Sequence, residues 1–221
     1  MFDNNLKYIE NKKDYIINTH KYKDADFRIA YFRKLIGINS NLNIIFSKID
    51  GLLPDNTPMT EREKESLDNF LKIAFVITDF ITLEVFLRII YKNIKEDNMD
   101  SIEKMWNGTK GIKEEFSIKS EYEESFCMLK EIRNASHNNF IYNKKSKTLT
   151  FRKEKYPFIK GKLLNKEDKE LTKWAKGLDF PLLSEIQEDN ILFVVDIIDT
   201  ISKDSRFNKF IEDPLVEAKK T

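Results

Sequence analysis

The chain has 221 residues and a net charge of +1, with 41% of its residues hydrophobic and 34% charged. This balance excludes a disordered chain, because enough apolar surface is available to offset the conformational entropy lost on folding. Six glycines and five prolines are few for an all-β protein, which needs many tight turns. We therefore expect a mainly α-helical bundle forming one domain over residues 1–221, with residues 1–55 as an N-terminal helical elaboration.

Several other classes are excluded by composition. The single cysteine, Cys127, rules out an intramolecular disulfide and a cysteine-based zinc site, and with two histidines and no glycine-rich phosphate loop neither a metal ion nor a cofactor is expected. The N-terminal stretch MFDNNLKYIENKKDY lacks the apolar core of a signal peptide, which predicts a cytoplasmic protein. The most apolar run, residues 70–90, carries four charged residues and predicts a buried helix, part of it serving a dimer interface, rather than a membrane span.

The first third of the chain predicts three helices. Apolar residues at helical spacing indicate a helix over residues 2–19. A second is expected through FRIAYFRKLIG, with Asp24 or Asp26 as its N-cap and Gly37 as its C-terminal stop. The third would start at Ser40 and run through SNLNIIFSKIDGLL. The following LPDNTPM, with two prolines, predicts a loop.

The strongest predicted element runs from Thr60 to about Glu96. Thr60 is a good N-cap, and Glu63 completes a capping box three residues later. The middle of this run is apolar nearly all round, which predicts burial on several faces within a bundle. Its β-branched residues make a strand the alternative, but no turn signal divides the run.

The middle of the chain predicts shorter helices and a hairpin. MDSIEKMWNGTKGIKEEF indicates short helices divided at Asn107-Gly108, and Ser120 is the expected cap of a helix through EYEESFCMLKEIRNASH. The hydrophobic period then changes, because residues 140–142 and 148–151 flank the polar segment NKKSK. This pattern predicts a small β-hairpin after the helix that carries Arg133.

The remainder predicts two more helices and contains most of the positive charge. The helices are expected over NKEDKELTKWAKGL and EDNILFVVDIIDTISKD, with Pro181 between them. From Lys144 to Lys162 eight basic residues face one acid, Glu154. Such a segment can attract phosphates, although a solvated lysine-rich loop has the same composition.

The stretch EIRNASHNNF contains the candidate site. If the helix persists to His137, its imidazole and the guanidinium of Arg133 lie one turn apart and face the same way. The guanidinium can hold phosphate oxygens, and the histidine titrates near neutrality, so it can transfer a proton. Asn134 and Asn138 can add hydrogen bonds to a phosphate or a ribose. An arginine and a histidine that only cap the helix or cover the core would show the same spacing.

EIRNASHNN also resembles the signature of the HEPN (higher eukaryotes and prokaryotes nucleotide-binding) superfamily. In that superfamily an arginine on a helical-bundle domain is followed by a polar residue and, after four to six intervening residues, by a histidine. Arg133, Asn134 and His137 match these positions, with three residues, NAS, intervening. The resemblance rests on these nine residues and on the predicted helical context.

The resemblance implies a metal-independent endoribonuclease found among toxins and antiviral defence proteins, which works as a homodimer with two motifs facing one cleft. Arg133 would hold the scissile phosphate, His137 would transfer a proton during attack by the ribose 2′-hydroxyl, and Asn134 would orient one of the two. DNA, which lacks that hydroxyl, would be spared. The other residues expected to contact RNA are Asn138, Lys144, Lys145, Lys147, Arg152 and Lys153.

The expected partners are therefore RNA, a second copy of the chain, and an antitoxin or another protein of a defence system. The alternative is a module of the same fold without catalysis, which binds RNA, a nucleotide or a protein. The short spacing between Arg133 and His137 favours this alternative.

Overall fold

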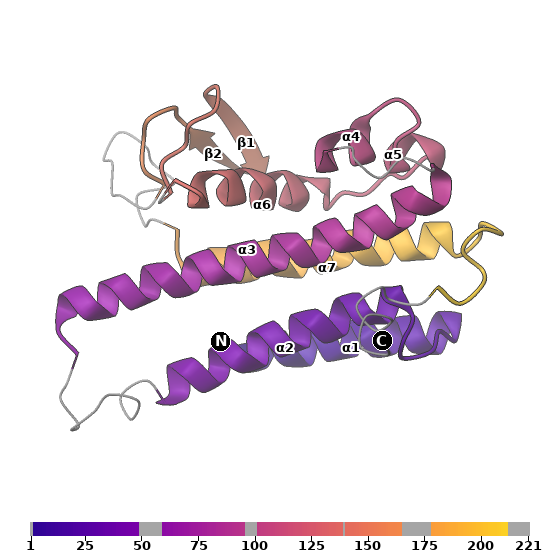
Figure 1. Ribbon diagram of the computed structural model, residues 1–221, viewed down its shortest axis with the longest axis horizontal. Coiled ribbons are helices and arrows are strands. Elements are labelled where there is room, and N and C mark those ends of the chain that lie inside the picture. Colours follow the sequence, from indigo (N-terminus) through magenta and orange to yellow (C-terminus); the bar gives the residue numbers. More distant parts are fainter. Residues whose placement is uncertain (1, 49–58, 96–100, 139, 165–177, 212–221) are drawn as a thin grey trace, which may run out of the picture.

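The fold is mainly helical and includes a small antiparallel hairpin, which confirms the predicted fold class. The computed structural model describes residues 2–48, 59–95, 101–138, 140–164 and 178–211. Three layers lie on one another in Figure 1. The first pairs α1 (Phe2–His20) with α2 (Phe27–Lys48), and the second pairs α3 (Glu61–Ile94) with α7 (Phe180–Ile201).

The third layer contains the helix that carries Arg133. It consists of α4 (Ile102–Asn107), α5 (Ile112–Glu115), α6 (Glu123–Ser136) and the hairpin strands β1 (Lys147–Phe151) and β2 (Glu154–Phe158). In Figure 1 the hairpin lies over one end of α6, and α4 and α5 lie beyond its other end. Helix α6 packs on α3 and α7, so the middle layer supports it from below.

One hydrophobic core joins the layers. Its largest side chain, Trp106 of α4, is fully buried and meets Phe193 of α7 edge-on, with ring centres 4.7 Å apart. The indole N–H donates to the Glu123 carboxylate at 2.8 Å, so the polar atom of this side chain is satisfied. Trp106 therefore attaches the third layer to the second.

The long helix α3 begins as predicted. The Thr60 hydroxyl accepts a hydrogen bond from the Glu63 backbone N–H at 3.3 Å, and the Glu63 carboxylate accepts one from the Thr60 backbone N–H at 2.8 Å. This capping box satisfies backbone donors that have no partner within the helix. The 34 residues of α3 span about 50 Å without a break, so the predicted element is a single helix.

Gly37 does not end a helix, which corrects one prediction. Helix α2 runs through it to Lys48, so the two helices expected there are one. Leu35, Asn39 and Leu42 are buried on one face of α2, and Asn39 donates to the Gln187 side chain of α7 at 3.0 Å. Packing on both sides of the exposed glycine therefore keeps the helix intact. Of the two candidate caps, Asp26 is the one whose carboxylate accepts from a backbone N–H of the first turn.

Two other predicted helix boundaries also differ. Helix α6 starts at Glu123, and Ser120 does not cap it; the Ser120 hydroxyl accepts from the Tyr122 N–H and donates to Asp196 of α7 at 2.6 Å. Helix α7 begins at Phe180, earlier than expected, so Pro181 lies in its first turn rather than between two helices. The helix predicted over NKEDKELTKWAKGL lies outside the described residues except for its last one.

The hairpin exists, but only one of its two strands is a predicted one. Residues 148–151 belong to the first strand, β1, which pairs with β2, while residues 140–142 form only an isolated bridge from Ile141 to Leu163. The turn is Arg152-Lys153, and both residues have positive φ, at 47° and 67°. Two left-handed residues match the twist of a tight hairpin. The basic segment NKKSK is consequently the approach to β1 and not the turn.

Candidate anion-binding site

Arg133 lies near the C-terminal end of α6, where its guanidinium covers an aromatic ring. The guanidinium carbon is 5.0 Å from the centre of the Phe80 ring, which belongs to α3 and is almost fully buried. Arginine stacks well on aromatic rings, and a positive charge is stabilised near a helix C-terminus. Among the described residues no carboxylate or carbonyl accepts a hydrogen bond from this guanidinium. Arg133 is therefore a positioned, half-buried cation with its donors available.

A pocket of about 350 Å³ opens beside this guanidinium. Three segments build it: the C-terminal half of α3, the start of α4, and α6 with the segment that follows. Four basic and two acidic side chains line it, so the pocket is positive. The lining residues are Phe80, Glu84, Arg88, Ser101, Ile102, Glu103, Lys130, Arg133, Asn134 and Lys144.

The four cations of the pocket differ in their partners. Arg88 pairs with Glu84 one turn earlier on α3, with an N–O distance of 2.6 Å. Lys130 lies 3.2 Å from a Glu103 carboxylate oxygen. Lys144, like Arg133, forms no ion pair within the described parts of the chain. Two cations are thus neutralised, and two remain able to bind an incoming anion.

Asn134 also lines the pocket, but His137 does not. Helix α6 ends at Ser136, and His137 follows as the C-cap residue with an exposed side chain. Asn138 is exposed too, and its backbone N–H donates to the carbonyl of Ala135. Of the predicted catalytic residues the structure therefore brings Arg133 and Asn134 together in one pocket and leaves the imidazole outside its lining.

The basic side chains between Lys144 and Lys162 differ in their exposure and in their ion pairs. Lys144 and Lys145 are exposed, as is Lys153 at the hairpin turn. The Lys147 ammonium lies 2.5 Å from a carboxylate oxygen of Glu131.

Arg152, predicted to bind RNA, instead holds the hairpin against α7. It pairs with Asp189 at 2.7 Å, with Glu185 at 3.4 Å and with Glu188 at 3.5 Å. These hydrogen bonds and charges, led by Asp189, raise the pKa of Arg152. Three carboxylates already pair with its guanidinium, so contact between Arg152 and RNA would require these ion pairs to break.

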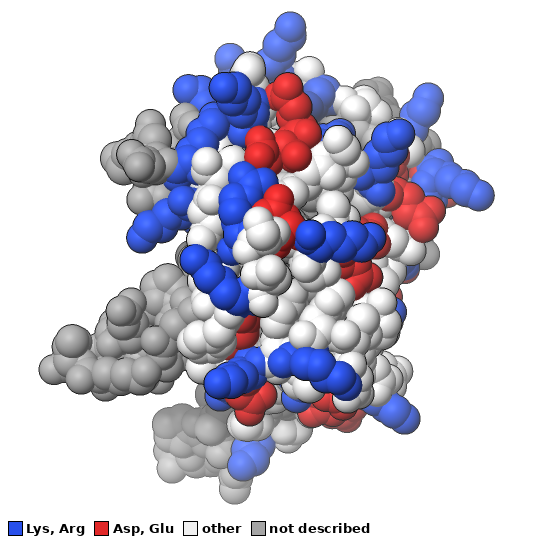
Figure 2. Space-filling model, turned by 90° about the vertical axis from the view of Figure 1, so that its right-hand side faces the viewer, with Lys and Arg blue, Asp and Glu red and all other residues white. Residues whose placement is uncertain are grey.

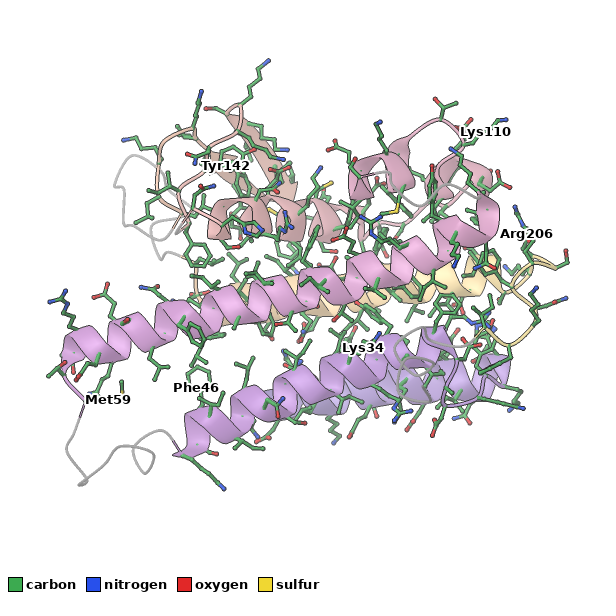
Figure 3. All side chains as sticks on the ribbon, viewed as in Figure 1. Lys34, Phe46, Met59, Lys110, Tyr142 and Arg206 are labelled. Atoms are coloured by element: carbon green, nitrogen blue, oxygen red, sulfur yellow. The ribbon has the colours of Figure 1, made fainter. Side chains whose placement is uncertain are left out.

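Glu131 is a site residue that the sequence did not indicate. Its side chain is 2% exposed, and its carboxylate accepts hydrogen bonds from Tyr142 at 2.9 Å and Lys147 at 2.5 Å. Asn134 approaches the same carboxylate at 3.4 Å. Burial opposes ionisation, but Lys147 and these hydrogen bonds hold the pKa of Glu131 below its usual value. Figure 3 shows Tyr142 on the segment above α6. Glu131 therefore ties that segment to the helix that carries Arg133.

Glu131 also lines a second pocket, of about 560 Å³, next to the first. The two pockets share Glu103 and Lys144. The remaining lining residues of the second pocket are Tyr142, Lys145, Ser146 and Lys147.

His20 has a partner that its neighbours in sequence did not reveal. Its Nε2 lies 2.7 Å from an Asp199 carboxylate oxygen, and its ring stacks on Tyr22 with centres 5.4 Å apart. Tyr15 donates to the same carboxylate at 3.2 Å. The cluster connects the end of α1 with the end of α7, and it lies apart from both positive pockets.

Charge is mixed on the end of the molecule that Figure 2 shows, where Lys and Arg side chains are interspersed with Asp and Glu. No group of three or more histidine, cysteine, aspartate or glutamate side chains among the described residues is arranged to hold a metal ion. Within the same residues no helix combines the length and the apolar character needed to cross a membrane.

The chain matches no family model, and comparisons with curated proteins and with solved structures find no match either. The chemistry of the pocket lining is therefore the basis for assigning a function.

Proposed function

We propose that this protein binds RNA and cleaves it as a HEPN-type endoribonuclease, without a metal ion, in a toxin or antiviral-defence setting. The observation that carries the proposal is the Arg133 guanidinium, which lies in a positive pocket with no carboxylate partner among the described residues. A guanidinium can hold two oxygens of one phosphate through parallel hydrogen bonds, and it stays charged at any physiological pH. The Arg133 guanidinium is held in place by Phe80 and has no ion-pair partner among the described residues, so it needs no rearrangement to accept a phosphate.

The proposed cleavage uses Arg133, Asn134 and His137. Arg133 binds the scissile phosphate and stabilises the negative charge that develops on its oxygens. The ribose 2′-hydroxyl attacks phosphorus, and its proton is removed while the 5′-oxygen of the next nucleotide leaves and gains a proton. The products are a 2′,3′-cyclic phosphate and a 5′-hydroxyl. In this proposal His137 transfers one of these protons, water exchanges the other, and Asn134 orients Arg133 or His137.

A homodimer accounts for the position of His137. Its exposed side chain lies outside the pocket lining of its own chain, so a second copy is proposed to face it across a shared cleft. An antitoxin or another defence-system protein is proposed to control access to this cleft.

Replacing Arg133 or His137 by alanine tests the proposal. We expect His137→Ala to slow RNA cleavage at least about 100-fold, the lower range for loss of a general acid or base. Arg133→Ala should reduce both cleavage and binding, because it removes the phosphate contact. Arg62→Ala, which removes the same charge from an exposed site in the first turn of α3, should change neither. Cleavage of an end-labelled RNA in EDTA, with DNA of the same sequence alongside, measures the effect.

The outcomes separate catalysis from binding alone. RNA that stays intact with the wild-type protein, while Arg133→Ala abolishes its binding, would support the second candidate, a non-catalytic RNA- or nucleotide-binding module. The position of His137 outside the pocket favours that candidate. A melting temperature lowered by many degrees in His137→Ala would instead indicate that the imidazole stabilises the fold.

A further inference from the structure

We propose that the two pockets beside α6 form one groove for two neighbouring phosphates of an RNA strand, and that Glu103 limits the affinity of this groove in the unbound protein. The inference rests on the proposed function and extends it, because it states how many phosphates the site binds and which residue opposes their binding. Its first subsite is the pocket of Arg133.

The second subsite is the pocket lined by Lys144 and Lys145. Lys144 lines both pockets, so one ammonium group can contact an anion in either. Lys145 lines only the second pocket, and it forms no ion pair within the described residues. Lys147, in contrast, forms an ion pair with Glu131, so it lines the second pocket without offering a free cation. The first subsite therefore has the Arg133 guanidinium and the second has the Lys145 ammonium, and both contain the Lys144 ammonium.

Because the two pockets share Glu103 and Lys144, they can bind neighbouring phosphates of one strand. Two pockets that meet at common residues can hold adjacent negative charges of one chain, whereas a single small anion would occupy only one. Phe80, under the Arg133 guanidinium, supports the first position from below. Lys144 lies between the two positions and would contact both phosphates.

Glu103 is the acidic side chain that belongs to both pockets. Its side chain is 65% exposed, and its carboxylate lies 3.2 Å from the ammonium of Lys130, which is only 11% exposed. Lys130 also lies 3.6 Å from Glu131, so it keeps a counter-ion when Glu103 moves away. Glu131 can thus serve as the counter-ion of Lys130 in place of Glu103. While the Glu103 carboxylate remains beside the two pockets, its negative charge repels phosphates from both subsites.

Short RNAs with 2′-O-methyl groups, which cannot be cleaved, separate the subsites. One probe carries a single internucleotide phosphate and the other carries two. At low salt the wild-type protein should bind the two-phosphate RNA about tenfold more tightly, as measured by calorimetry or fluorescence anisotropy. Lys145→Ala should remove most of this gain, because it should weaken binding of the two-phosphate RNA more than binding of the one-phosphate RNA. Arg133→Ala should weaken binding of both.

Glu103→Gln provides the second measurement. It removes one negative charge from both pockets and should strengthen binding of both RNAs several-fold. Glu65→Gln, the same change at an exposed position in the first turns of α3, serves as the matched control and should have no effect.

The results that contradict this inference differ from those that contradict the proposed function. Equal affinity of the wild-type protein for the two RNAs, with Arg133→Ala still weakening both, would overturn the second subsite alone. Unchanged or weaker binding by Glu103→Gln would overturn the role of Glu103. Absence of any RNA binding by the wild-type protein would contradict the proposed function and this inference with it.

Discussion

Replacing Arg28 by methionine is expected to lower the free energy of unfolding by about 3–5 kcal/mol. Arg28 and Asp26 form an ion pair in which both side chains are 0% exposed, with two N–O distances of 2.6 Å. The guanidinium also donates to the backbone carbonyls of Phe207, at 2.5 Å, and Lys209, at 3.0 Å. Methionine fills the space but leaves the buried Asp26 carboxylate without its counter-ion, and the Phe207 and Lys209 carbonyls without their guanidinium donor, which accounts for the large effect.

For a chain of this size the loss corresponds to a fall in melting temperature of about 10 °C, measured by circular dichroism. Arg33→Met, at an exposed position of the same helix, is the matched control and should change the unfolding free energy by less than about 0.5 kcal/mol. The double variant Asp26→Asn/Arg28→Met should regain part of the loss, because it removes the uncompensated charge. A single variant within 1 kcal/mol of the wild type would mean that the pair contributes little to stability.

Replacing Asp79 by asparagine is expected to remove a pH dependence of stability. Asp79 of α3 is 1% exposed, and neither of its carboxylate oxygens has a hydrogen-bond partner of good geometry among the described residues. Burial raises its pKa to about 7, and Gln187, which approaches the carboxyl, offsets this rise only in part. The folded protein therefore keeps this carboxyl protonated at pH values where the unfolded chain has lost the proton.

The sign of the effect follows from the proton count. Between about pH 4 and pH 7 unfolding releases the proton of Asp79, so the wild-type protein loses stability as the pH rises, by about 4 kcal/mol across the interval. Above pH 7 both states are ionised and the contribution of Asp79 is level. Asp79→Asn is neutral throughout, so this slope should disappear and the variant should be at least as stable as the wild type at pH 7.5.

Urea unfolding of both proteins between pH 4.5 and pH 8 measures this difference. Asp24→Asn, which changes an exposed aspartate, should keep the wild-type slope. Identical pH profiles for Asp79→Asn and the wild type would show that the buried carboxyl is ionised in the folded protein over this range.

Features fixed by nearby residues were predictable from the sequence. The capping box of Thr60 and Glu63 and the break at Asn107-Gly108 depend on residues within one or two turns, and both predictions are confirmed. Gly37 shows where local signals fail. The contact of Asn39 with Gln187, which comes from α7 far along the chain, outweighs the local preference of glycine for a helix end.

The turn and the second strand of the hairpin differ from the prediction for a related reason. Its turn consists of Arg152 and Lys153, neither of which is the glycine or asparagine that usually marks left-handed positions. The ion pairs of Arg152 with α7 hold the hairpin against the bundle, and they join residues 33 to 37 positions apart. No spacing rule in the sequence connects such residues.

Part of the candidate site is predictable from the sequence. Arg133, Asn134 and Lys144 were identified from one short motif and from a basic segment, and all three line the pocket. Phe80 and Glu103 come from other helices, and their roles depend on how α3 and α4 pack beside α6. The ligand and the chemistry remain predictions that the variants above test.

The placement of the pocket on α3 has a practical consequence. Phe80, Glu84 and Arg88 line the pocket from the same helix that contributes Asp79 and Phe86 to the interior. A compound that binds this pocket in the folded protein and not the unfolded chain favours the native state, by about 2.7 kcal/mol at a concentration one hundred times its dissociation constant. Fluorescence-based screening of metabolite and oligonucleotide libraries for heat protection can thus identify the natural ligand without assuming its class.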